Sequence, residues 1–180
     1  MSRATSRAVH PPKGTLMTAA VQRLNHAVLY VTDAERSATF YVDNLGFSIV
    51  YSFPGGAFLK AFNSPHDHDL GLFSIGPSTP KPARTTGLYH LAWQVDTIED
   101  LAQMRAKLLS VGSLVGESDH GVSKSLYCHD LDGIEFEVMW AVPRSEWKAA
   151  RVGTEKLQLD RDLARWARTP SLHESAVASA

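Results

Sequence analysis

The feature that most constrains the fold is an internal repeat in the middle of the chain. Residues 24–46 and residues 88–112 follow the same order: a β-type run, a helix start, and a helix that ends before a glycine. His26 corresponds to His90, because each stands two residues after the leucine that opens its copy, at an offset of 64 (90 − 26). Three further β-type runs follow each helix, so each half is predicted to be a βαβββ unit.

Valine, leucine and aromatic residues mark the expected strands, and glycine and proline mark the turns between them. The expected strands are 23–31, 46–52, 56–63 and 68–75 in the first half, and 88–96, 114–119, 123–129 and 134–141 in the second. One half alone cannot bury its apolar sheet face. We therefore expect an α+β fold in which two tandem βαβββ modules form one curved mixed sheet around a cavity, with the helices outside.

The helix starts carry capping patterns, Thr32 with Glu35 in the first copy and Thr97 with Asp100 in the second. Leu159, Leu163 and Trp166 follow the spacing of one helix face and predict a short helix near 155–168. The expected organisation is a flexible tail over 1–20, one domain over 21–144 made of modules 21–76 and 87–144, and a C-terminal extension over 145–180.

Composition excludes several classes of protein. Lys and Arg total 18 against 19 Asp and Glu in 180 residues, and a net charge of −1 argues against a general nucleic-acid binder. Cys128 is the one cysteine, which excludes an internal disulfide framework and indicates a reducing, cytoplasmic location. No apolar run approaches the roughly 20 residues that span a membrane.

Strand alternation places His26 and His90 at equivalent positions on one face of their strands. A single histidine on a strand is usually structural, whereas two at equivalent repeat positions favour a shared metal in the cavity. Glu135 and Glu137 share one face of the last strand and offer a carboxylate ligand. Two histidines and a carboxylate form the facial triad of non-haem iron(II) oxygenases. The alternative is a solvent-facing strand with two ordinary glutamates.

These repeated halves, with His26, His90 and Glu137 in place, resemble the vicinal oxygen chelate superfamily over about residues 22–147. The segment 119–137 is similar to the signature of type I extradiol ring-cleavage dioxygenases. In that signature, His-Gly precedes a tyrosine that stands ten positions before the glutamate ligand. Tyr127 and Glu137 have this spacing, which selects Glu137 over Glu135 by resemblance.

The resemblance also implies roles for two further histidines. His68, in the sequence His-Asp-Leu-Gly-Leu-Phe, is similar to the histidine beside bound substrate and dioxygen, although a simple polar turn is the alternative. His120 is the histidine of the His-Gly pair and lies seven residues before Tyr127, two closer than in some relatives. Leu131 stands where the family usually has proline. Tyr127, His68 and His120 are therefore the expected catalytic residues.

The resemblance implies an extradiol dioxygenase that cleaves a catechol-class aromatic diol with O2. Its cofactor would be Fe(II), with Mn(II) as the alternative, held by His26, His90 and Glu137. A small aromatic diol and O2 would be its partners, with no nucleic acid and no membrane, and we expect a homo-oligomer because sheet edges of this kind are often covered by a second subunit. The rival hypotheses are another metal-dependent lyase, isomerase or fosfomycin-type transferase, and a metal-free small-molecule binding protein.

Overall fold

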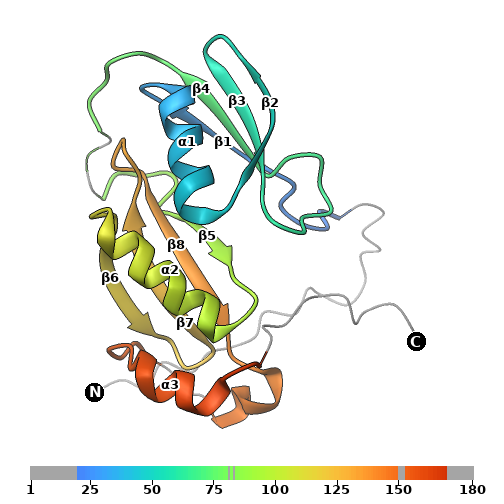
Figure 1. The fold of residues 1–180 in the computed structure, drawn as a ribbon, viewed down its shortest axis with the longest axis vertical. Coiled ribbons are helices and arrows are strands. Elements are labelled where there is room, and N and C mark those ends of the chain that lie inside the picture. Colours follow the sequence, from blue (N-terminus) through green and yellow to red (C-terminus); the bar gives the residue numbers. More distant parts are fainter. Residues whose placement is uncertain (1–19, 81, 83, 150–152, 170–180) are drawn as a thin grey trace, which may run out of the picture.

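The structure, a computed structural model, describes residues 20–80, 82, 84–149 and 153–169. The tail predicted over 1–20 lies outside these residues except for Ala20. Two βαβββ modules follow one another along the chain, as the repeat predicts, and Figure 1 shows the first above the second with α1 and α2 on the same side. No helix of the described residues is long and apolar enough to cross a membrane.

Each module forms its own four-stranded mixed sheet. The first contains β1 (Ala27–Val31), α1 (Ala34–Leu45), β2 (Ser48–Phe53), β3 (Gly56–Lys60) and β4 (Leu70–Ser74), with strand order β1-β4-β3-β2. The second contains β5 (Leu91–Gln94), α2 (Ile98–Ser110), β6 (Leu114–Asp119), β7 (Ser123–His129) and β8 (Glu135–Ala141), with strand order β5-β8-β7-β6.

In each sheet the first strand pairs in parallel with the last, and the other pairs are antiparallel. The α+β class and the two modules are confirmed. The strands make two mixed sheets that do not close into a barrel, where the repeat suggested one curved sheet.

The ends of the helices follow the local sequence, with one correction. The capping box of Thr97 and Asp100 is present as predicted, whereas α1 is capped by Asp33, whose carboxylate accepts the amides of Glu35 and Arg36. Thr32 instead uses its hydroxyl and its amide to bond Asp132, 2.6 and 3.0 Å away, in the second module. A contact 100 residues distant therefore displaced the local capping pattern.

Alternation along the strands decides which face is buried. Leu29 and Val31 of β1 are buried against the helix side, while Val28 and Tyr30 are exposed on the opposite face. The same parity buries Phe136, Val138 and Trp140 of β8, which belong to the hydrophobic core that both modules share. One face of each sheet is thus covered by its helix, and the other face remains available for a site.

The two modules are joined by side chains of α1. Tyr41 is buried, packs against Phe136 at 6.2 Å between ring centroids, and donates a hydrogen bond to Asp130 at 3.0 Å. Phe47, just beyond α1, packs edge-on against Trp93 of β5 at 5.0 Å. The relative position of the modules therefore depends on contacts between residues far apart in sequence.

The C-terminal extension packs against the second module. It contains a 3-10 helix, Arg144–Ala149, and α3, Leu159–Trp166, which lies within the range where a helix was expected. Trp166 packs on Trp140 with ring centroids 5.4 Å apart. Lys124 of β7 is 3% exposed and contacts Asp119 at 2.6 Å and Asp162 of α3 at 3.7 Å. This buried ion-pair cluster holds α3 in place.

Candidate active site

The two histidines at equivalent repeat positions stand immediately before the first strand of their module. His26 precedes β1 and His90 precedes β5, so each is held at the strand end by the parallel ladder to β4 or β8. Their surroundings differ. His26 Nδ1 lies 2.8 Å from Asn25 Oδ1, and its ring lies 4.6 Å from that of His68.

The second module gathers four predicted site residues. His90 Nε2 lies 3.1 Å from Glu137 Oε2, and the ring of His90 lies 5.7 Å from that of Tyr127. Tyr127 stands directly opposite Glu137 in the β7–β8 ladder. The Tyr127 hydroxyl and His120 Nε2 are 2.8 Å apart. The spacing of ten residues between Tyr127 and Glu137 therefore corresponds to a cross-strand pair, because β7 and β8 are joined by a tight turn.

Electrostatics keep the Tyr127 phenol protonated. Burial raises the pKa of Tyr127 above its usual value, and the negative charge of Glu137 raises it further, with smaller contributions from Tyr89 and Glu135. The charge of Glu135 likewise raises the pKa of Tyr89. His90 Nδ1 is buried and has no hydrogen-bond partner among the described residues, since Glu135 Oε1 is 3.6 Å away. This face of the second module is thus rich in carboxylates and phenols.

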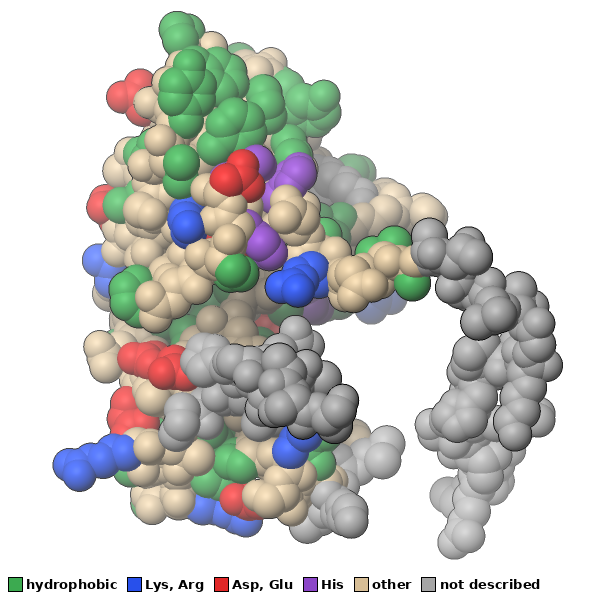
Figure 2. Space-filling view, turned by 90° about the vertical axis from the view of Figure 1, so that its right-hand side faces the viewer, with side chains coloured by type: hydrophobic (Ala, Val, Ile, Leu, Met, Phe, Trp, Pro, Cys, Tyr) green, Lys and Arg blue, Asp and Glu red, His purple; other side chains and the backbone are tan. Residues whose placement is uncertain are grey.

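The first module places its histidines beside a row of aromatic rings. His68 packs on Phe58 at 4.8 Å, and its Nδ1 lies 2.9 Å from Asp67 Oδ2. Ring contacts of 5.8–6.0 Å continue from Phe58 along the open face of the sheet. We call this row, made of Tyr51, Phe53, Phe58 and Phe73, the aromatic row. Figure 2 shows hydrophobic side chains at the top of this face with histidines directly beneath.

The two groups do not meet in one chain. Among the residues that the structure describes, no three His, Cys, Asp or Glu side chains are arranged to hold a metal ion. Figure 1 shows β1 beginning on the right of the molecule and β5 beginning on the left, so their histidine-bearing ends lie on opposite sides. The described structure brings Glu137 to His90 but does not bring His26 to this pair, and the assignment of the three residues as ligands of one metal ion stays a prediction.

A hollow lies between the two modules. It has a volume of 1310 Å³ and is lined by Tyr30 from β1 and by Tyr89 and Glu135 from the second module. Neither His26 nor His90 lines it.

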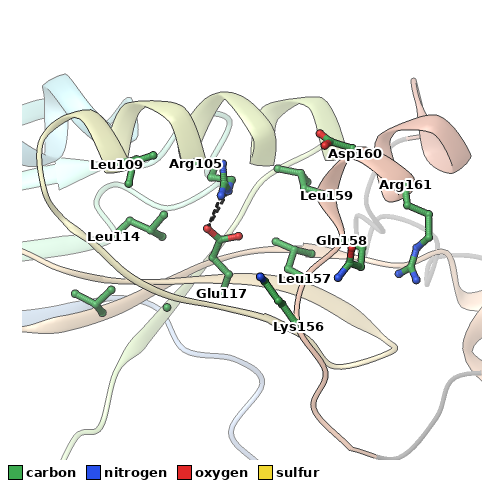
Figure 3. Close-up of a pocket in the computed structure, with 12 residues that line it drawn as sticks. Arg105, Leu109, Leu114, Glu117, Lys156, Leu157, Gln158, Leu159, Asp160 and Arg161 are labelled. Atoms are coloured by element: carbon green, nitrogen blue, oxygen red, sulfur yellow. Dashed lines mark hydrogen bonds and ion pairs between the residues drawn. The ribbon is translucent and has the colours of Figure 1, made fainter.

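A second hollow, shown in Figure 3, lies between α2, β6 and the segment that enters α3. It has a volume of 610 Å³, and Arg105 and Glu117 form an ion pair at 2.9 Å across it. None of the predicted site residues lines it. No histidine lines it.

Some residues of the candidate site could not be assigned from the sequence. Asp67 adjoins His68 and pairs with it, and Phe58 provides the ring on which His68 rests. Phe58 and Phe73 could have been found by alternation along β3 and β4, but the contact with His68 needs the folded loop. His66 is partly buried and pairs with Asp69 at 3.0 Å. Cys128 is buried in the apolar core.

Comparison with known proteins agrees with this fold. Residues 23–138 match the family described as the Glyoxalase/Bleomycin resistance protein/Dioxygenase superfamily. The fosfomycin resistance protein FosX of Listeria monocytogenes is 21% identical and aligns with 71% of this chain and 99% of its own, with a TM-score of 0.55. A glyoxalase/dioxygenase from Nostoc punctiforme is 20% identical and aligns with 74% of this chain and 100% of its own, with a TM-score of 0.58. The chain belongs to this superfamily.

The chain is also similar in sequence to two curated dioxygenases. A catechol-2,3-dioxygenase of Bacillus subtilis is 33% identical over 132 residues, which are 72% of this chain and 45% of that protein. Biphenyl-2,3-diol 1,2-dioxygenase 3 of Rhodococcus globerulus is 35% identical over 118 residues, 62% of this chain and 59% of that protein. The chain thus aligns with about half of the length of these relatives.

Proposed function

We propose that the chain is an extradiol dioxygenase that opens the ring of a catechol-class diol with O2, using Fe(II), with Mn(II) as the alternative, held by His26, His90 and Glu137. The observation that carries the proposal is the grouping of His90, Glu137, Tyr127 and His120 on one sheet face. The diol dioxygenases among the curated relatives support the same activity. The cytoplasmic location expected from the single cysteine stays a prediction.

Tyr127 would orient the diol by a hydrogen bond. The Thr154 hydroxyl lies 3.3 Å from His120 Nδ1 and can donate to it, so that the proton of His120 resides on Nε2. Nε2 then donates to the Tyr127 oxygen at 2.8 Å, which leaves the phenol proton free for a substrate oxygen. The raised pKa of Tyr127 keeps that proton in place at neutral pH.

His68 would serve as the general acid. Asp67 Oδ2 accepts a hydrogen bond from His68 Nδ1, which leaves Nε2 to deliver a proton. The aromatic row beside it provides a flat apolar wall suited to an aromatic ring. These roles describe what the side chains of this chain can do, and they support a ring-shaped substrate over an aliphatic one.

The alternatives stay within the same superfamily. The fold of FosX supports another metal-dependent enzyme, such as a lyase, isomerase or fosfomycin-type transferase, which would need neither His68 nor Tyr127. A metal-free binding protein would use the aromatic row alone. The three hypotheses differ in whether metal binds and whether O2 is consumed.

The test is to purify the protein without oxygen, load it with Fe(II), and add a panel of catechols with O2. We expect O2 uptake and a yellow ring-fission product. Glu137→Gln should abolish both, whereas Glu135→Gln, two residues away on the same face, serves as the matched control and should retain them. Metal binding without O2 uptake on any diol would move the assignment to another enzyme class. No metal binding would refute both enzymatic hypotheses.

A further inference from the structure

We propose that the C-terminal extension positions His120 in the active site. Residues 153–166 fix the turn that carries His120 and decide which of its ring nitrogens holds the proton. The inference rests on the dioxygenase function proposed above, in which His120 Nε2 donates a hydrogen bond to Tyr127. The family match ends at residue 138, so this role belongs to a part of the chain that lies beyond the family domain.

The extension meets the second sheet at its edge, next to His120. β6 is the outermost strand of that sheet, and its final residue, Asp119, forms an antiparallel bridge with Glu155. The Asp119 amide donates to the Glu155 carbonyl at 2.8 Å, and the Glu155 amide donates to the Asp119 carbonyl at 2.9 Å. His120 is the next residue of the chain, so the bridge fixes the backbone where the turn into β7 begins.

The side chain of Asp119 connects this turn to α3. Its carboxylate accepts the amide of Gly121 within the turn at 2.8 Å and the ammonium group of the buried Lys124 at 2.6 Å. Arg161 of α3 lies 3.4 Å from the same carboxylate, and the buried Asp162 lies 3.7 Å from Lys124. Because removing one partner leaves a buried charge unpaired, the turn and the helix are held together by one set of charges.

The far end of α3 is held by an aromatic contact. Trp166 packs on Trp140 with ring centroids 5.4 Å apart, and its indole N–H donates to Glu146 at 2.8 Å. Figure 1 shows α3 lying across one end of the second module. Trp166 stands twelve residues after Thr154 (166 − 154), so a substitution there tests whether the docking of the helix is coupled to the turn.

Thr154 supplies the chemical part of the positioning. Its hydroxyl lies 3.3 Å from His120 Nδ1. A neutral imidazole carries one N–H, so a hydroxyl that donates to Nδ1 places the proton on Nε2, which donates to the Tyr127 oxygen at 2.8 Å. With the proton on Nδ1 instead, Nε2 would accept the phenol proton, and Tyr127 would have none for a substrate oxygen. Thr154 is therefore a positioning residue that acts through His120 and Tyr127.

The protonation of His120 tests the proposal without metal, diol or O2. The full chain is prepared with isotope-labelled histidine and a chelator, and NMR spectra that correlate ring protons with ring nitrogens are recorded at pH 8, where an ordinary imidazole is neutral. The His120 signals are those that His120→Gln removes. We expect a protonated Nε2 in the wild type and in Thr154→Ser, and a mixture of both tautomers in Thr154→Val, which has no hydroxyl. Thr39→Val, on the exposed side of α1, is the matched control and should leave the signals unchanged.

Trp166→Ala tests the coupling of α3 to the turn. It should speed hydrogen exchange at the Asp119 amide by about tenfold or more and give the same mixed tautomers as Thr154→Val. If the alanine variant does not fold, Trp166→Leu replaces it, because leucine still packs on Trp140 but cannot donate to Glu146. In the iron-loaded enzyme, Thr154→Val should lower kcat about 10- to 100-fold at unchanged metal content, and Thr154→Ser should restore it.

Three results would overturn the proposal. One is a wild-type His120 that is protonated on Nδ1, and another is a set of His120 signals that Thr154→Val leaves unchanged. The third is a Trp166 variant with the exchange rate and the tautomer of the wild type, which would separate the extension from the turn. Tautomers that change as expected, in a chain whose wild type consumes no O2 with any diol, would uphold the positioning role and refute only the dioxygenase assignment.

Discussion

Replacing Tyr41 with phenylalanine removes one hydrogen bond from the contact between the two modules. Tyr41 is 1% exposed, and its hydroxyl donates to Asp130 Oδ2 at 3.0 Å. The ring remains free to pack on Phe47 and Phe136, at 5.9 and 6.2 Å, so the substitution isolates the hydroxyl. Burial raises the pKa of Tyr41 well above its usual value, so the phenol stays a donor across the working pH range.

The expected loss follows from the charge on the acceptor. A hydrogen bond to a charged group contributes about 1.5–3 kcal/mol, so we expect the free energy of unfolding to fall by about 2 kcal/mol. At about 2–4 °C per kcal/mol for a chain of this size, the Tm should fall by about 4–8 °C. Urea and thermal unfolding followed by circular dichroism at pH 7 measure both quantities. Tyr51→Phe, at a tyrosine that is 61% exposed, is the control and should change stability by less than about 0.5 kcal/mol.

The loss should also depend on pH. Burial raises the pKa of Asp130, although amide hydrogen bonds from Ile134 and Asp132 and the bond from Tyr41 oppose that rise. As the pH falls through this raised pKa, Asp130 becomes neutral and accepts a weaker hydrogen bond, so the difference between Tyr41→Phe and wild type should shrink. A loss equal to that of Tyr51→Phe, or one unchanged at acid pH, would refute the reasoning.

Three further predictions concern the site, the extension and the cysteine. His68→Phe should keep the metal content and the packing on Phe58 but lower kcat about 100-fold or more, measured by O2 uptake; full activity would exclude His68 as the acid. Burial alone would raise the pKa of Asp119, but its bond to Lys124 holds that pKa below the usual value. Its stabilisation is therefore present above the unfolded value near 4 and lost as the pH falls through the lowered pKa. Asp119→Asn should cost about 3 kcal/mol at pH 7 and flatten the acid limb of a stability–pH curve, and an unchanged limb would contradict this. Burial raises the pKa of Cys128 to about 12, so iodoacetamide should modify it only after unfolding, as mass spectrometry would reveal.

The strands and helices could be predicted because their signals are local. Gly46 ends α1 with a φ of 75°, as a glycine after a helix predicts, and alternation along β1 separates the buried Leu29 from the exposed Tyr30. The prediction failed at Thr32, since its hydroxyl bonds Asp132 in the other module. A local capping pattern carries no information about a competing hydrogen-bond partner that is 100 residues away in the sequence.

In the candidate site, too, some contacts could be predicted from the sequence and others could not. Tyr127 and Glu137 could be paired from the sequence, because a hairpin register is set by a short turn. The contact of His68 with His26 joins a loop before β4 to the start of β1, and the parallel pairing of those strands creates it. The prediction that His26 and His90 share one cavity depends on how the two modules are placed, which local patterns do not specify.

The sequence by itself therefore determined the two βαβββ modules, the face on which each functional side chain lies, and the types of ligand available. Only the tertiary structure decided which of those faces meet. The reason is physical: alternation and capping depend on neighbours a few residues apart, whereas the placement of one module on the other depends on buried contacts such as Tyr41 with Asp130 and Phe47 with Trp93. In the resulting structure His26 lies beside His68 in the first module, and His90 lies beside Glu137 in the second.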